Sequence, residues 1–413
     1  MKLSDPSVLR NPIGLLCLMV CSGYAASGMA SPSQRDAAAI AVGPVDVTPT
    51  LGVEAKYRDN IYLQEDNETS SWIYLLQPGI NARVQDRLNY YQLDYKSEAA
   101  WYEEDSDGDE NNYYDQTFSG DAHMLFSDTW VVDLGASWAG LHEDRGTGLS
   151  EGVVGRVLPK PIKYDQTDFT GSVRYGREGG IGALKLRAGY MDRVYQNFRD
   201  LTRLRDRDET TLGATLYYPL APKTDLLLEY TYKDINYPNN VPELAPLDSE
   251  ENFVLLGVEW EITPNLVSVV KAGYVDKSFA SSEREDWDGV GIELALQMQP
   301  TEIDRVRING RRSPEETSVQ GDFIVREELS AEWVHDWSDR VYTTLDGSAG
   351  RDTFEGSFDD REDDIYSIGI EAGYAFRRWA NFYIGYVYDE KDSNVDTLSY
   401  TDNTFRIGVD LSL

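Results

Sequence analysis

Apolar and polar residues alternate with a period of two through most of the chain, from about Val47 onward. Between positions 91 and 101 the odd positions carry Tyr, Leu, Tyr, Ser, Ala and Trp, whereas the even positions include Gln, Asp, Lys and Glu. Successive side chains of a β-strand point to opposite faces, so this pattern predicts a strand with one apolar and one polar face. Residues 404–413 repeat the alternation, and long helix-spaced apolar stripes are absent.

Eighteen segments follow this pattern, and each is predicted to be a strand. They lie near 47–60, 71–84, 88–102, 113–126, 130–141, 164–175, 181–195, 208–218, 224–235, 252–261, 266–277, 289–298, 304–312, 319–334, 341–351, 364–376, 381–389 and 401–413.

The connections between these segments alternate in length. Short turns are expected at 85–87, 127–129, 176–180, 219–223, 262–265, 300–303, 336–340 and 377–380. Longer polar loops are expected at 61–70, 103–112, 142–163, 196–207, 236–251, 278–288, 352–363 and 390–400, with a shorter one at 313–318. Short turns on one side and long loops on the other are typical of outer-membrane barrels. We therefore predict an all-β fold, a transmembrane antiparallel up-and-down β-barrel with about 18 strands, short periplasmic turns and long extracellular loops. A soluble lectin-like or propeller fold is the alternative.

The first thirty residues read as a targeting segment. Lys2 and Arg10 precede an apolar stretch at 13–20, and small residues follow up to Ala30, which predicts a signal peptide at residues 1–30. A lipoprotein signal processed at Cys21 is the alternative. Cys17 and Cys21 both lie in this segment, so the mature chain is expected to have no disulfide. Residues 31–46 are then a short periplasmic N-terminal tether, and residues 47–413 form the barrel.

Composition agrees with a barrel in the outer membrane of a Gram-negative bacterium. The net charge is -34, from 38 Lys and Arg against 72 Asp and Glu, which excludes a nucleic-acid partner because phosphate binding needs a basic face. The mean hydropathy of -0.48 excludes a bundle of apolar helices, but a barrel needs only every second residue to be apolar. Many of the 27 Tyr and nine Trp lie near strand ends, as expected of the aromatic girdles at the two membrane interfaces.

The C-terminal strand carries a short motif, Arg406, Gly408, Leu411 and Leu413. Its form is similar to the signal by which outer-membrane barrels are recognised for insertion, although Leu413 stands where Phe or Trp is usual. The barrel assembly machinery is accordingly an expected partner.

The N-terminal part of the barrel carries a family resemblance. Residues 57–62 read Tyr-Arg-Asp-Asn-Ile-Tyr, followed by Ser71-Trp72 and by Pro78-Gly79-Ile80. This order resembles the opening of the putative outer-membrane beta-barrel porin 2 family, and the resemblance extends loosely across 45–413. The resemblance implies an outer-membrane barrel associated with exopolysaccharide or capsule production, with polysaccharide secretion components as partners. It brings no catalytic residues, and the chain has no helical-repeat scaffold ahead of the barrel.

Sequence motifs for catalysis are absent, so the protein is not expected to be an enzyme. The three histidines, His123, His142 and His335, form no zinc or hydrolase motif, and only His142 with Ser150 could imitate a catalytic pair. No cofactor or metal is expected. Asp105, Asp107 and Asp109 are weak Ca²⁺ candidates because alternate carboxylates supply hard oxygen ligands, and the alternative is a solvated loop. Acidic loops could also bridge through divalent cations to lipopolysaccharide, which is an expected partner together with outer-membrane lipid.

Assigning the polar parity inward predicts the residues that line the channel. The principal candidates are Asp94, Lys96, Glu98, Arg174, Lys185, Arg187, Glu229, Arg305, Arg307, Asp346, Glu371 and Arg406. The same parity adds Asp121, Glu259, Glu293, Arg326, Glu328, Glu332 and Asp410, and the aromatic residues Tyr217, Tyr342 and Tyr383. Rings of charged side chains can set which solutes pass, or the charges can pair and brace the wall. Glu327 falls on the apolar parity of its strand, which a bulge or a position near the outer rim would explain.

A barrel of eighteen strands leaves room for an aqueous channel. The leading hypothesis, which follows from the family resemblance, is a porin-like channel that exports exopolysaccharide or capsular polysaccharide. A general or solute-specific diffusion porin for small molecules is the alternative, and a structural surface barrel with a plugged lumen is a third. The stretch from His142 to Lys163 is the candidate for a constriction loop, with a mobile surface loop as the alternative.

Overall fold

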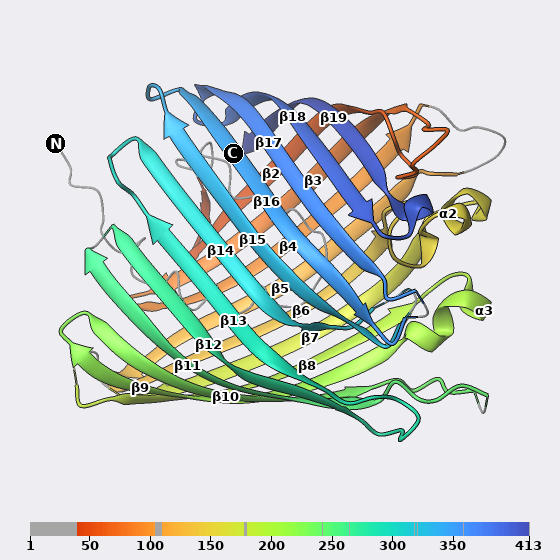
Figure 1. Ribbon diagram of the computed structural model, residues 1–413. Helices are drawn as coiled ribbons and strands as arrows, with labels where there is room; N and C mark the ends of the chain where they lie inside the picture. The colour runs from red at the N-terminus through yellow and green to blue at the C-terminus, as the bar shows by residue number, and fades with distance from the viewer. Residues whose placement is uncertain are drawn as a thin grey trace.

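A closed antiparallel barrel of eighteen strands forms the body of the molecule (Figure 1). The computed structural model describes residues 39–412 except 104–109, 177–179, 242, 264, 318, 320 and 358. Each strand pairs with its neighbours in sequence, and β19 (Tyr400–Ser412) closes the barrel on β2 (Val45–Arg58), where Phe405 lies opposite Tyr57. Closure leaves every strand of the barrel paired on both sides, which a membrane requires because lipid cannot satisfy free backbone groups.

The remaining barrel strands agree closely with the predicted segments. They are β3 (Ser71–Asp86), β4 (Asn89–Tyr102), β5 (Tyr113–Ser127), β6 (Trp130–Glu143), β7 (Ile162–Tyr175), β8 (Ala183–Tyr195), β9 (Arg207–Ala221), β10 (Thr224–Asn236), β11 (Ser249–Thr263), β12 (Leu266–Phe279), β13 (Trp287–Met298), β14 (Asp304–Glu315), β15 (Phe323–Asp336), β16 (Val341–Glu355), β17 (Glu362–Arg377) and β18 (Ala380–Ser393). Several of them run two or more residues beyond the predicted ends, on the side of the long loops. The predicted fold class, including the alternation of short turns and long loops, is confirmed.

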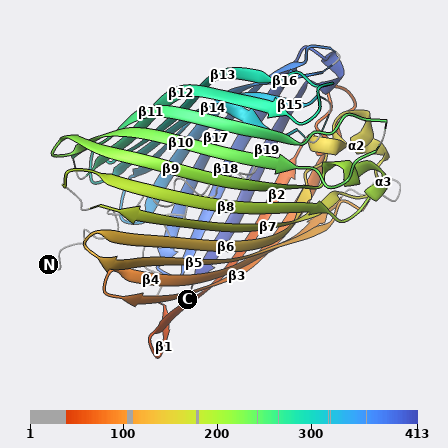
Figure 2. The same ribbon diagram turned by 90° about the horizontal axis from the view of Figure 1, so that it is seen from below.

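The segment expected to be a tether contains a further strand. β1 (Ile40–Val42) pairs with the start of β2 through a turn at Gly43, whose φ of 65° is a left-handed conformation that glycine adopts without strain. The hairpin projects from the barrel wall in Figure 2. Residues 1–38, which include the predicted signal peptide, lie outside the described residues.

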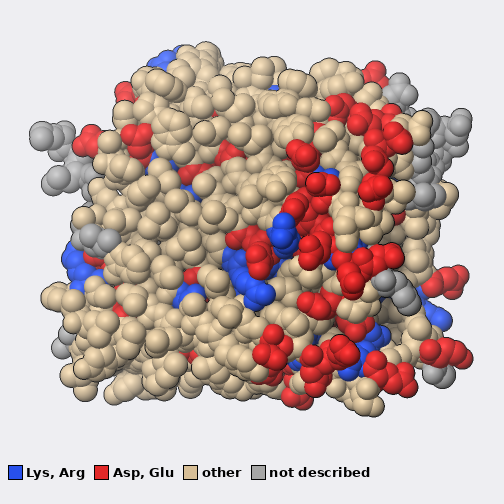
Figure 3. Space-filling model, viewed as in Figure 1, with Lys and Arg blue, Asp and Glu red and all other residues tan. Residues whose placement is uncertain are grey.

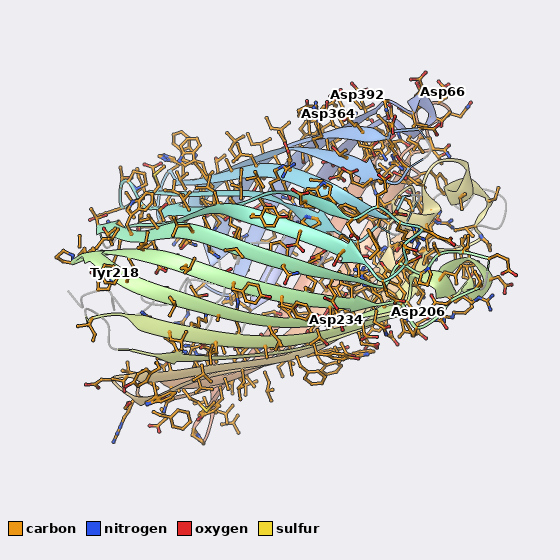
Figure 4. All side chains as sticks on the ribbon, turned by 60° about the horizontal axis from the view of Figure 1, so that its bottom comes forward. Asp66, Asp206, Tyr218, Asp234, Asp364 and Asp392 are labelled. Atoms are coloured by element: carbon orange, nitrogen blue, oxygen red, sulfur yellow. The ribbon has the colours of Figure 1, made fainter. Side chains whose placement is uncertain are left out.

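The two faces of the wall differ as the alternation predicts. Large apolar side chains such as Leu186, Leu256 and Phe405 are more than half exposed on the outer face, where the membrane lies, whereas polar partners meet on the inner face. Figure 4 places Tyr218 at one end of the barrel and Asp66, Asp206, Asp234, Asp364 and Asp392 at the other. In Figure 3, acidic side chains on the visible face gather toward the end with the long loops, so this part of the negative charge lies on the extracellular side.

Glu327 faces outward, as its parity requires, and its strand has no bulge there, since β15 pairs in unbroken register with both neighbours. It lies four positions from the extracellular end of β15, opposite Arg312 of β14, and their side chains form an ion pair at 2.7 Å. The rim position, together with this partner, accounts for a carboxylate on the lipid-facing parity.

Helices are short and lie at the extracellular end. The structure has α2 (Val153–Val157) and α3 (Arg199–Thr202), with 3₁₀ turns at η3 (Gly148–Ser150), η4 (Arg203–Arg205) and η5 (Asp396–Leu398). Both α2 and α3 appear at the same end of the barrel in Figures 1 and 2. Within the described part of the chain, none of the helices has the length and apolar character that crossing a membrane would need.

Candidate functional site

The inner wall carries rows of charged side chains that alternate in sign. One row, which we name the central ladder, consists of Arg187, Glu229, Lys271 and Glu293 on β8, β10, β12 and β13. Glu229 lies 2.7 Å from Arg187 and 3.2 Å from Lys271, and Lys271 reaches Glu293 at 2.6 Å. The four side chains point inward from nearby strands, and the strand register places them side by side. Arg187 and Glu229 were predicted as lining residues, and the ladder accounts for their charges by mutual pairing.

A second row, the upper ladder, lies closer to the extracellular loops. It runs through Arg207, Glu209, Lys233, Glu251, Lys277 and Glu316. Lys277 sits between Glu251 at 3.0 Å and Glu316 at 2.5 Å, and the Lys277 and Glu251 side chains are fully buried. Ion pairs withdrawn from water are stable only when every charge keeps a partner. The sequence prediction missed this row because it placed Arg207 and Glu316 in loops. Glu316 follows the last residue of β14.

On the side of β14 to β19, the predicted lining residues also pair. Arg305 contacts Asp336 at 2.8 Å, and Arg406 contacts Glu371 at 3.0 Å. Arg326, on the same inner face, bridges Glu315 at 3.0 Å and Asp352 at 2.5 Å. Arg307 lies opposite Glu332 in the β14–β15 register, and Asp346 lies opposite Glu332 in the β15–β16 register.

Two of the three inward tyrosines are bonded into the wall. Tyr342 donates its hydroxyl proton to Glu371 at 3.2 Å and accepts from Asn381 at 2.9 Å, while Tyr383 donates to Glu54 at 2.7 Å. These contacts brace neighbouring strands. The ring of the third, Tyr217, lies 5.1 Å from the guanidinium of Arg174.

Hydrogen bonds from amide and hydroxyl groups to carboxylates hold the wall formed by β3 to β5. Asp94 accepts hydrogen bonds from Asn81 and Gln92, both at 2.7 Å. Glu98 accepts from Gln77 at 2.7 Å and from the Tyr113 hydroxyl at 2.5 Å. Lys96 projects between these two carboxylates on the same strand and is exposed. The role of all these residues in selectivity remains a prediction.

The loop between β6 and β7, residues 144–161, crosses the extracellular mouth. Glu151 in this loop contacts the Arg361 guanidinium at 2.7 and 2.8 Å and also pairs with Lys391 of β18. Since β6 and β18 are not neighbours around the barrel, the loop must pass over the strands between them. This places the predicted constriction loop across the mouth instead of free at the surface.

The loop between β6 and β7 packs so closely against the loop between β2 and β3 that position 146 requires a glycine. Gly146 has a φ of +77°, and a Cβ added there would lie 2.2 Å from the Tyr62 carbonyl oxygen in the loop between β2 and β3. The Arg145 side chain folds back to donate to the carbonyl oxygens of Gly155 at 2.9 Å and Leu158 at 2.6 Å. The loop between β6 and β7 is thus folded compactly and packs against the loop between β2 and β3.

Loops over the other half of the mouth are tied together as well. Arg284, between β12 and β13, donates to the Pro246 carbonyl oxygen at 2.8 Å and pairs with Asp322. Tyr237 donates its hydroxyl to Glu316. Burial alone would raise the pKa of Glu316, but the nearby Lys277 and Arg207 outweigh burial and hold that pKa below its usual value. Burial and the Glu316 charge together raise the pKa of Tyr237 well above its usual range.

Comparison with known proteins gives one decisive match. The family described as "Putative beta-barrel porin 2" matches residues 33–413. The chain belongs to this family. Its members are porin-like barrels, and this protein is a porin-like β-barrel channel of the outer membrane. A search of curated proteins finds no match.

Several solved structures resemble this family member at low sequence identity. OpdL of Pseudomonas aeruginosa is 12% identical, with a TM-score of 0.45 over 90% of this chain and 99% of that chain. OccAB3 of Acinetobacter baumannii is 12% identical, with a TM-score of 0.47 over 90% and 100%. OccK2 (OpdF) of Pseudomonas aeruginosa is 11% identical, with a TM-score of 0.47 over 89% and 98%.

His142 and Ser150 do not form a catalytic pair in this porin 2 family member. The Ser150 hydroxyl donates to the carbonyl oxygens of Thr147 at 2.8 Å and Asp144 at 3.2 Å. His142 lies between Asp115 at 2.8 Å and Asp144 at 3.3 Å and stacks on Tyr113. His142 therefore contacts Asp144 at the start of the loop that crosses the mouth, and Ser150 stabilises a turn within that loop.

Two other sets of predicted residues fall partly or wholly outside the described chain. The Ca²⁺ candidates Asp105, Asp107 and Asp109 lie outside it, and within the described residues no group of three or more His, Cys, Asp or Glu could hold a metal ion. Leu413 of the insertion motif is also outside. Leu411 pairs with Ala380 of β18, while a Cβ on Gly408 would meet the Tyr383 hydroxyl at 2.3 Å.

Proposed function

We propose that this protein is a diffusion porin for small polar solutes. The observation that carries the proposal is the loop between β6 and β7, which is tied across the mouth of a wide barrel by Glu151, Arg361 and Lys391. Eighteen strands enclose enough space for water, and a loop held across the mouth would narrow the entrance to that space. Charged rows on the inner wall favour polar solutes over apolar ones.

Polysaccharide export is less well supported. A chain of sugars would need a wide mouth and free aromatic faces along its path. The mouth loops are tied to each other, the Tyr342 side chain is buried, and the Arg406 guanidinium lies over the Tyr383 ring at 5.9 Å. Export therefore rests on the sequence resemblance alone.

Liposome swelling tests the proposal. The purified full-length protein is reconstituted into liposomes, which are diluted into isotonic arabinose, raffinose or dextran. We expect rapid swelling in arabinose, slower swelling in raffinose and none in dextran beyond that of empty liposomes. Absence of swelling in arabinose would support a plugged structural barrel, and swelling in dextran would support polymer export.

A further inference from the structure

Arg174 on β7 and Lys185 on β8 are direct cross-strand neighbours on the inner wall. Like charges placed directly opposite each other destabilise a sheet. Among the described residues neither side chain forms an ion pair, and the buried Nε of Arg174 has no hydrogen-bond partner. The next inward cation along β8, Arg187, is by contrast neutralised by Glu229 at 2.7 Å. The wall thus carries two neighbouring positive charges without an ion-pair partner among the described residues, near the end of β7 and the start of β8.

A matching pair of negative charges lies two strands away. Asp225 on β10 and Glu259 on β11 are also direct cross-strand neighbours, and neither forms an ion pair within the described part of the chain. Arg174 and Lys185 are close enough to act electrostatically on Glu259. The strand β9 lies between the two pairs and contributes Tyr217, whose ring lies beside Arg174. β8 and β10 are about 10 Å apart across the strands. Along the strands, Lys185 aligns through Thr215 with Glu229, so Asp225 lies four positions nearer the turn between β9 and β10.

Folding alone does not account for this arrangement. In the central ladder, by contrast, the charges alternate in sign so that each cation touches a carboxylate. Here the two cations and the two carboxylates lie in separate pairs, so their charged groups can bind a ligand. A carboxylate can accept charge-assisted hydrogen bonds from a guanidinium and an ammonium together, and two carboxylates can bind one ammonium.

We propose that these four residues form a binding site for a small zwitterionic solute, in which Arg174 and Lys185 hold its carboxylate and Asp225 and Glu259 hold its ammonium group. The proposal rests on the proposed function, because the solute must diffuse through the lumen to reach the site. A dianion meets the repulsion of Asp225 and Glu259, and a dication meets that of Arg174 and Lys185. Charge complementarity on both sides therefore favours a solute with one charge of each sign.

Single-channel current block tests the proposal with 4-aminobutyrate as the zwitterion, glutarate as the dianion and putrescine as the dication. We expect 4-aminobutyrate to block the current of the full-length protein at lower concentration than either other compound. Lys185→Gln and Glu259→Gln should each raise its half-blocking concentration at least about fivefold, which is roughly the effect of 1 kcal/mol. The matched control is Lys223→Gln, an exposed lysine near the same end of the barrel, which should leave the block unchanged.

The outcomes separate this site from the channel function itself. Equal block of wild type and Lys185→Gln would overturn the site while leaving a working porin. Glutarate blocking as strongly as 4-aminobutyrate would also overturn it, in favour of a simple anion site. A protein that conducts no current would overturn the proposed function, and this inference with it.

Discussion

Glu151, in the loop between β6 and β7, accepts hydrogen bonds from two guanidinium nitrogens of Arg361, at 2.7 and 2.8 Å. The two residues are 210 positions apart in the sequence. Arg361 also donates to Asp363 at 3.0 Å, and its side chain is almost fully buried. Paired hydrogen bonds between a guanidinium and a carboxylate fix geometry as well as charge. This contact is therefore the main tie that holds the loop across the mouth.

Replacing the carboxylate should release the loop. Glu151→Gln keeps the size of the side chain but removes the charge that Arg361 and Lys391 share, so we expect a larger and noisier single-channel conductance. Planar-bilayer recording measures both properties. Glu65→Gln, an exposed residue in the loop between β2 and β3, is the matched control and should behave as wild type. Equal conductance in Glu151→Gln and wild type would show that the loop does not narrow the pore.

Removing a cation from the upper ladder should destabilise the barrel. Lys277→Met removes the cation that the buried Glu251 and Glu316 share, although Glu251 keeps Lys233 at 3.5 Å, and breaking a buried ion pair costs about 3–5 kcal/mol. Urea unfolding of the protein reconstituted in lipid vesicles measures this loss. Lys223→Met removes an exposed lysine whose Glu261 contact is 3.9 Å long, so its cost should stay below about 1 kcal/mol. Similar costs for the two variants would contradict a structural role of the ladder.

The outward pair of Arg312 and Glu327 should be coupled. A double-mutant cycle with Arg312→Leu and Glu327→Leu should give a coupling free energy of up to about 1 kcal/mol, because the pair lies at the rim and is partly exposed. The double variant should unfold at nearly the wild-type urea concentration, since a leucine pair suits a lipid-facing position. Strictly additive effects of the single substitutions would indicate that the two charges act independently.

Acid should loosen the loops around Glu316. The pKa of this carboxyl is held below its ordinary value of 4.5, so its contribution to stability is present above pH 4.5 and is lost as pH falls through the lower folded-state pKa. We expect protection of the Val319 and Asp322 amides, which donate to the Thr317 hydroxyl and the Glu355 carbonyl oxygen, from hydrogen exchange to fall on acidification below about pH 4.5. Glu316→Gln should remove this pH dependence. An unchanged acid response in that variant would assign the effect to another carboxylate.

The periodicity of the sequence was sufficient to predict the barrel, but it did not predict which side chains pair on the inner wall. Two-residue alternation determines which side chains share a face, so the inward positions of Arg187, Glu229 and Arg406 follow from parity alone. Pairing partners depend on register and on strand ends. Lys277 meets Glu316, for example, only because Glu316 extends past the end of β14.

Loop docking could not be derived from local pattern. The stretch 142–163 was identified as a candidate for the constriction because of its length and its Gly-rich, basic character, but its partner Arg361 lies on the far side of the closed barrel. Only closure of β19 on β2 brings the two together. An alternating sign of charge on nearby inward positions, as in Arg207 and Glu209 of β9 and Lys233 of β10, is the sequence signal that could have revealed the upper ladder.

The central claim is that the lumen is an aqueous path through the membrane. Planar-bilayer recording of the purified full-length protein tests it most directly. We predict discrete and reproducible conductance steps in potassium chloride, with single steps that grow in Glu151→Gln. A protein that inserts into the bilayer and yet conducts no ions in either form would contradict the account.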